Sequence, residues 1–173
     1  MLNRRRMMMN QNDGLVLFED GEFNPILGEI KKSGFWAIEA WRLPIKIENG
    51  EIVMSRGYGS NSWWGASPID ISAYKYLCVE WSNIYTYTGY LEQALAGFTN
   101  QIISNTSYET CYPADCRCIN LSPKTEAGIN KIEINESTII DKHNCYFSVA
   151  VSGWNFNTAE WEHIYSIKKI WLE

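Results

Sequence analysis

Residues 57–82 read Gly57-Tyr-Gly-Ser-Asn-Ser-Trp-Trp-Gly-Ala-Ser-Pro68 and then Ile69-Asp-Ile-Ser-Ala-Tyr-Lys-Tyr-Leu-Cys-Val-Glu-Trp-Ser82. The first half is rich in glycine and serine and contains adjacent tryptophans, a composition that predicts a loop. The second half alternates, with Leu77, Val79 and Trp81 on one side, which predicts a half-buried strand. We therefore expect a solvated loop with large aromatic side chains that leads directly into a core strand.

The same strand signals recur along the rest of the chain. Two alternating runs flank Asn49-Gly50, a dipeptide that tolerates the positive φ angles of a type I′ turn, and they predict a hairpin with Ile45 and Ile47 facing the core. Other strands are expected at 15–18, 34–42, 97–103, 118–121, 131–135, 145–154 and 164–172, the last with a bulge near Lys168-Lys169. About nine short strands without a convincing long helix predict an all-β fold, an antiparallel β-sandwich of jelly-roll type.

Length and charge limit the class of protein. A chain of 173 residues predicts one domain, here residues 15–173, preceded by a short N-terminal arm at 1–14 that carries Arg4–Arg6. The net charge of −5 argues against a nucleic-acid-binding protein, which needs a basic surface. No apolar run is long enough to span a membrane, and Met7–Met9 is too short for the core of a signal peptide, so we expect synthesis in the cytosol.

Aromatic residues are abundant, with eight Trp and ten Tyr, and they suggest a recognition surface. A sugar ring has an apolar C–H face that stacks on an exposed aromatic ring and hydroxyl edges that bond to polar side chains. Small residues Ser148, Ala150 and Ser152 ringed by aromatics predict a shallow groove, and adjacent residues of an extended chain point to opposite sides, so one of the tryptophan pair should face solvent. The candidate ligand-binding residues are Tyr58, Asn61, Trp63, Trp64, Tyr76, Glu80, Tyr146 and Trp154. The alternative is that these side chains belong to the core or to a subunit interface.

The cysteines allow three interpretations: free buried thiols, a disulfide or a structural zinc site. Cys111, Cys116, Cys118 and Cys145, with His143 nearby, could supply zinc ligands, but the spacing matches no standard zinc motif. No motif for a catalytic nucleophile, a zinc protease or a phosphate-binding loop is present, and Glu80 lacks an evident second carboxylate for glycoside hydrolysis. We therefore expect no cofactor and no enzymatic activity.

Two segments resemble those of a known class of domain. Ile69–Trp81 resembles the strand entry common in jelly-roll, carbohydrate-binding-module-like domains, and Ile164–Glu173 resembles their last strand. The opening Met1-Leu-Asn-Arg-Arg-Arg-Met-Met-Met9 resembles the start of tail and adhesin-type virion proteins of bacteriophages. The resemblance implies a binding or building module displayed on a virion, and it transfers no ligand positions.

These observations together favour a non-enzymatic bacteriophage virion component, such as a tail, fibre or capsid-decoration subunit, with a face that binds cell-surface polysaccharide. Its partners would be other virion proteins and copies of itself, assembled through the N-terminal arm as a cyclic homo-oligomer. The first alternative is a purely structural virion subunit without a ligand. The second is a small glycan-active enzyme.

Overall fold

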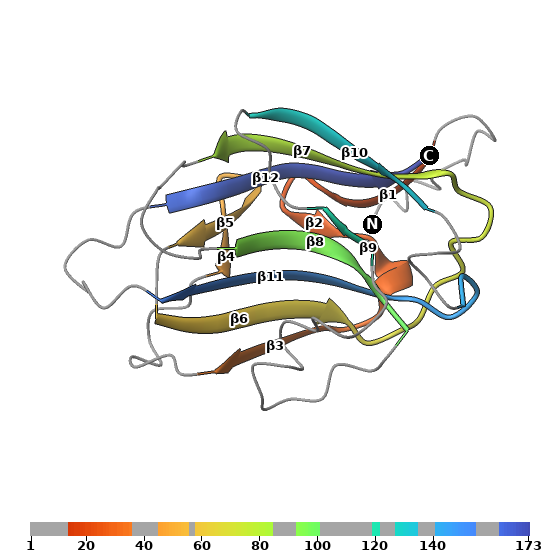
Figure 1. Cartoon of the computed structure of the whole chain (residues 1–173), viewed down its shortest axis with the longest axis horizontal. Helices are drawn as coiled ribbons and strands as arrows, with labels where there is room; N and C mark the ends of the chain where they lie inside the picture. The colour runs from red at the N-terminus through yellow and green to blue at the C-terminus, as the bar shows by residue number, and fades with distance from the viewer. Residues whose placement is uncertain are drawn as a thin grey trace, which may run out of the picture.

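The chain folds into two antiparallel sheets that enclose a hydrophobic core (Figure 1). The structure is a computed structural model that describes residues 14–35, 45–55, 58–84, 93–100, 119–121, 127–134, 141–154 and 163–173. The antiparallel β-sandwich predicted from the sequence is confirmed. The predicted arm, most of the 34–42 strand and the 104–118 loop lie outside the described residues. No helix within the described ranges is long and apolar enough to cross a membrane.

The seven-stranded sheet is organised around its longest strand, β12 (His163–Leu172). One edge of β12 pairs with β7 from Tyr165 to Leu172, while the other edge pairs first with β5 and then with β1. The register shifts between Ile167 and Lys169, which confirms the predicted bulge. The remaining strands of this sheet are β1 (Leu15–Glu19), β2 (Glu22–Phe23), β4 (Ile45–Glu48), β5 (Glu51–Ser55), β7 (Tyr76–Ile84) and β10 (Gly128–Glu133), with a short 3-10 turn, η1 (Pro25–Leu27), after β2.

The five-stranded sheet corrects the prediction for the aromatic loop. Its strand order is β3 (Ile30–Phe35), β6 (Tyr58–Gly65), β11 (Tyr146–Trp154), β8 (Gln93–Thr99) and β9 (Ile119–Leu121). Most of the stretch predicted as a loop is therefore strand β6, which is hydrogen-bonded to β3 on one side and to β11 on the other. Glycine and serine disfavour a strand locally, but pairing on both edges overrides this weak preference.

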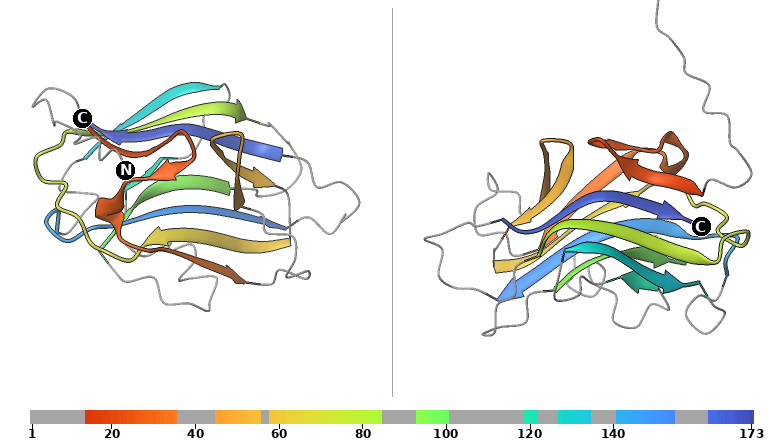
Figure 2. Two further views of the ribbon diagram at one scale, coloured as in Figure 1. Left: turned by 180° about the vertical axis from the view of Figure 1, so that it is seen from behind. Right: turned by 90° about the horizontal axis from the view of Figure 1, so that it is seen from above.

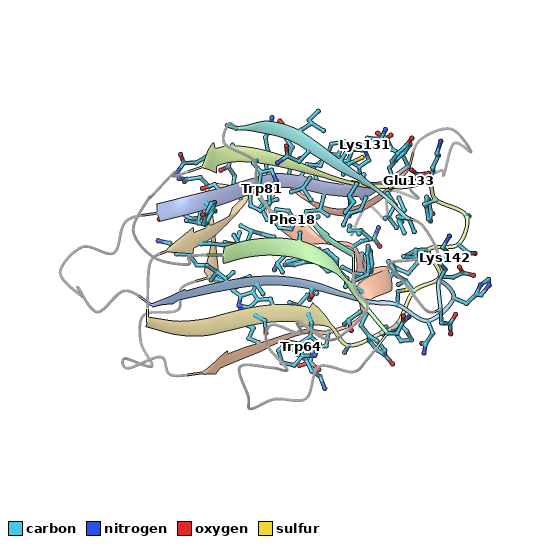
Figure 3. The ribbon with its side chains drawn as sticks, in the orientation of Figure 1. Phe18, Trp64, Trp81, Lys131, Glu133 and Lys142 are labelled. Carbon is cyan, nitrogen blue, oxygen red and sulfur yellow. The ribbon has the colours of Figure 1, made fainter. Side chains whose placement is uncertain are left out.

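The core lies between the two sheets and is built by the alternating strands that the sequence indicated. Leu77, Val79 and Trp81 of β7 are buried as predicted, and Phe147 and Val149 of β11 face them from the other sheet. Phe18 and Trp81, both labelled in Figure 3, are among its largest fully buried side chains. The rings of Trp81 and Tyr165 make a T-shaped contact with 6.2 Å between centroids.

Two tight hairpins meet at one side of the sandwich. Asn49 and Gly50 have φ angles of 53° and 83°, which confirms the predicted type I′ turn between β4 and β5. Asp20 and Gly21 form a similar turn between β1 and β2, with φ angles of 51° and 82°. The two hairpins lie next to each other in the view from behind (Figure 2). Ile45 is buried as predicted, but Ile47 is 42% exposed because it lies beside the turn on an edge strand.

Candidate functional site

The structure separates the predicted ligand-binding residues into two groups on opposite sides of the sandwich. Tyr76 and Glu80 alternate with the core residues of β7, so they lie on the outer face of the seven-stranded sheet. Trp64 and Tyr146 belong to the outer face of the five-stranded sheet, where Trp64 lies opposite Ser148 in register. The prediction that all these residues line a single groove is therefore wrong. Alternation along a strand tells which residues share a side, but it does not tell which sheet the strand joins.

Both tryptophans of the adjacent pair are buried, with exposed fractions of 3% for Trp63 and 5% for Trp64. Trp63 belongs to the core cluster, and the Lys32 ammonium lies 4.1 Å from its ring centroid. Trp64 points to the other side of the sheet and is labelled in Figure 3. The prediction that one of the two faces solvent is wrong because the sheet is covered on both sides at this point, where Ser62 and Ser148 are buried too.

Three other predicted ligand-binding residues are located by strand register alone. Tyr58 pairs with Trp154 at one end of β6 and β11, and Asn61 pairs with Val151. Their role as ligand-binding residues stays a prediction.

Two half-buried aromatic side chains lie together on the outer face of the seven-stranded sheet. Tyr76 is in β7 and Trp171 is in the neighbouring β12, where Trp171 pairs with Cys78 in register. Since Cys78 is two residues from Tyr76 on the same strand, the two rings occupy diagonal positions within reach of each other. Trp171 was not predicted as a site residue, although the bulge expected near Lys168-Lys169 reverses the alternation and places it on this face.

The Glu173 carboxylate contacts the Trp171 indole and the lysine beside Tyr76. The Trp171 indole Nε1 donates to Glu173 Oε1 at 3.0 Å, and the Lys131 ammonium forms an ion pair with Glu173 Oε2. Lys131 Nζ also lies 4.0 Å from the Tyr76 ring centroid, a cation–π contact. Hydrogen bonds from Lys131 and then Trp171 lower the pKa of Glu173, so this carboxylate is ionised at neutral pH. Each of the two rings therefore contacts one member of the same ion pair.

Charged, paired and buried groups surround the two rings on this face. The Lys168 ammonium lies 3.2 Å from Glu80 Oε1, so the predicted ligand residue Glu80 is part of a surface ion pair. The Cys78 side chain is buried, and desolvation raises the pKa of its thiol to about 11. Lys131 and Glu133 both project from the edge strand β10 (Figure 3). This cluster of Tyr76, Trp171, Lys131 and Glu173 is called the aromatic platform below.

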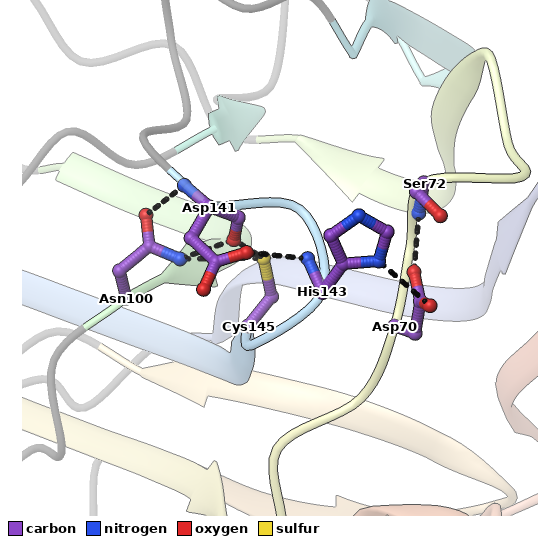
Figure 4. Close-up of polar contacts among 6 residues, drawn as sticks. All are labelled: Asp70, Ser72, Asn100, Asp141, His143 and Cys145. Carbon is purple, nitrogen blue, oxygen red and sulfur yellow. Dashed lines mark hydrogen bonds and ion pairs between the residues drawn. The ribbon is translucent and has the colours of Figure 1, made fainter.

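A second polar cluster joins two loops at the end of the sandwich (Figure 4). His143 Nδ1 lies 3.0 Å from Asp70 Oδ2, and this hydrogen bond raises the pKa of His143 and lowers that of Asp70. The Asn100 amide donates to the carbonyls of Asp141 and Asn144 at 2.5 and 2.9 Å. These contacts hold residues 141–145 against 69–72, where Ile69 forms a β-bridge with Cys145.

The proposed zinc ligands are not brought together in the described part of the chain. Cys111, Cys116 and Cys118 lie outside it, and no group of three metal-ligating side chains occurs within it. Cys145 is a free, buried thiol whose sulfur donates to the Asp141 carbonyl at 3.1 Å. Desolvation raises the pKa of Cys145 to about 11, which keeps the thiol protonated.

Comparisons with known proteins leave the family open. No protein-family model matches the chain, and no curated protein matches it. Among solved structures, the chain is similar to the carbohydrate-binding module TmCBM61, solved in complex with β-1,4-galactotriose. The identity is 10% over 91% of this chain and 97% of that chain, with a TM-score of 0.41. A TM-score at this level is too low to indicate function or site residues.

Proposed function

We propose that this chain is a non-enzymatic glycan-binding module whose binding surface is the aromatic platform. The observation that carries the proposal is that two half-buried rings, Tyr76 and Trp171, lie together on a sheet face and are held through one carboxylate. Among the other described aromatic side chains, Phe23 and Tyr74 pack against the core, and Tyr146 lies on the opposite side of the molecule.

The chemistry of the platform suits a sugar chain. The apolar C–H face of a pyranose can stack on an amphipathic ring, and the hydroxyl edges can bond to the charged groups around it. Because Trp171 is hydrogen-bonded to Glu173 and Tyr76 contacts Lys131, binding should lose less side-chain entropy than it would at unattached rings. Glycoside hydrolysis requires a pair of carboxylates, whereas the platform as defined holds one, Glu173, which accepts bonds from Trp171 and Lys131.

The virion setting remains part of the proposal and is supported by the resemblance of residues 1–9. In that setting the chain would be a tail, fibre or capsid-decoration subunit that assembles with copies of itself and presents the platform to cell-surface polysaccharide. One structural feature supports assembly: Ile129 is 63% exposed on β10, the edge strand of the seven-stranded sheet as described. This same feature favours the second candidate, a structural subunit without a ligand.

A glycan array with the purified chain tests the binding function. We expect retention of at least one polysaccharide, and retention of none would refute the proposal. With a glycan identified, ¹H–¹⁵N spectra of the tryptophan indole groups locate the site, with Trp171 assigned from a Trp171→Phe variant. The Trp171 indole signal should shift on titration while that of buried Trp81 stays in place. The reverse pattern would place the site elsewhere.

Light scattering, which measures the size of oligomers, distinguishes a structural subunit from a glycan-binding module. A structural subunit should form oligomers that an Ile129→Lys substitution weakens, with no effect of added glycan. An Asn83→Lys substitution, at an exposed position of β7, is the matched control. Oligomers that both variants leave unchanged would show that β10 is not the contact edge.

A further inference from the structure

The charges around the aromatic platform cancel one another. Three lysines of this face each have a carboxylate partner within the same face, the pairs being Lys131–Glu173, Lys168–Glu80 at 3.2 Å and Lys169–Glu19 at 2.8 Å. A neighbouring carboxylate offsets the charge of an ammonium group and so weakens its attraction for an acidic ligand. These lysines therefore offer little attraction to an acidic sugar.

Two further charged groups beside Tyr76 have no ion-pair partner among the described residues. Glu133 lies opposite Tyr76 in register on β10, and its side chain is exposed. Lys75 immediately precedes Tyr76, and its ammonium lies 5.1 Å from the Tyr76 ring centroid. Interaction with the Tyr76 phenol and then with the Glu133 carboxylate raises the pKa of Lys75, so the amine is charged at neutral pH. The two charges are opposite, which leaves the face without a net attraction for either sign.

We infer that the ligand of the aromatic platform is an uncharged sugar chain, with Lys75 donating to its hydroxyls and Glu133 accepting from them at the edge of Tyr76. The inference rests on the glycan-binding function proposed above. A hydroxyl group is both donor and acceptor, so a neighbouring ammonium and carboxylate can each bond to it. The net charge of −5 adds a general repulsion toward polyanionic chains such as polyuronates.

Binding to matched neutral and acidic polysaccharides tests the inference. The probes are galactan, β-glucan and mannan on one side and polygalacturonate and alginate on the other, at low and high NaCl. We expect retention by a neutral chain, with a dissociation constant that changes less than about twofold as salt shortens the Debye length from roughly 30 Å to roughly 3 Å. Retention by the acidic chains alone, lost in high salt, would overturn the inference while leaving the glycan-binding function intact. Retention by neither group would refute the function itself.

Two substitutions test the assigned roles. Lys75→Gln and Glu133→Gln should each weaken binding of the retained neutral glycan about fivefold, the loss of one exposed charge-assisted hydrogen bond. Glu22→Gln, on β2 at the opposite end of the sheet order, is the matched control and should leave the dissociation constant unchanged. Unchanged binding in both Lys75→Gln and Glu133→Gln would overturn the assignment, and circular dichroism confirms that each variant is folded.

Discussion

Replacing Trp63 by phenylalanine should cost much less stability than the same replacement at Trp81. The two residues are a matched pair, because both lie in the core cluster with exposed fractions of 3% and 1%. Lys32 lies over the Trp63 ring, a cation–π contact that a phenyl ring can still make. Within the described chain the two residues also differ at the indole nitrogen. The indole Nε1 of Trp63 is buried and has no hydrogen-bond partner among the described residues. The indole Nε1 of Trp81 is not unsatisfied in this way.

The magnitude follows from two opposing effects. Shrinking a buried indole to a phenyl ring removes apolar surface equivalent to about two CH₂ groups, a loss of roughly 1.6 kcal/mol before any cavity is counted. At Trp63 the same change removes an unsatisfied buried donor, which recovers about 1–3 kcal/mol. Trp63→Phe should therefore lie within about 1 kcal/mol of the wild type, while Trp81→Phe should lose about 2 kcal/mol.

Urea unfolding followed by far-UV circular dichroism measures both free energies without relying on tryptophan fluorescence. At about 2–4 °C per kcal/mol for a chain of this size, Trp81→Phe should lower the Tm by roughly 4–8 °C and Trp63→Phe by much less. Trp63→Leu, which also lacks the donor but fits the pocket poorly, controls for shape. Equal losses for Trp63→Phe and Trp81→Phe would refute the reasoning, since they would show that the Trp63 indole N–H is satisfied.

Three other predictions concern the turn, the loop cluster and the thiols. Gly50→Ala places a side chain at a φ of +83° and should destabilise the chain by about 1–2 kcal/mol in urea unfolding; an unchanged midpoint would show that the turn relaxes. The raised pKa of His143 means that its pair with Asp70 stabilises the fold below the unfolded pKa of about 6.5, and that this contribution is lost as pH rises through the folded pKa. Asp70→Asn should lower the pKa of His143 in an NMR titration, and an unmoved pKa would rule out the pair. Because burial raises the pKa of Cys78 and Cys145 to about 11, iodoacetamide at pH 8 should leave both unmodified in the folded chain, and rapid alkylation found by peptide mass spectrometry would contradict their burial.

The fold could be predicted because the strongest local patterns belong to strands with one buried face. Leu77, Val79 and Trp81 alternate with polar residues, and the Asn49-Gly50 turn has the chemistry that a hairpin needs. Strand β6 was not predictable in the same way. Its glycine and serine residues suggest a loop, and only pairing with β3 and β11, which are distant in sequence, makes it a central strand.

The candidate site was predictable only in part. Tyr76 was correctly assigned to a face that the core leaves open, because the alternation of β7 is regular. Trp171 was not predicted: a bulge near Lys168-Lys169 was expected, but its position, which decides the face of Trp171, is set by pairing with β1 and β7. Lys131 and Glu173 look like ordinary surface charges in the sequence, and their role emerges only when β10 and the chain end are placed beside Tyr76.

Isothermal titration of the retained glycan against Trp171→Ala and Tyr146→Ala tests the central claim most directly. Both residues are half-buried aromatics, but they lie on opposite sides of the sandwich. Stacking one sugar face on the indole removes roughly 60 Å² of apolar surface from water, which at about 25 cal/mol per Å² corresponds to a tenfold change in affinity. We predict that Trp171→Ala raises the Kd about tenfold and that Tyr146→Ala leaves it unchanged. A loss of binding in Tyr146→Ala with full affinity in Trp171→Ala would contradict the assignment of the aromatic platform.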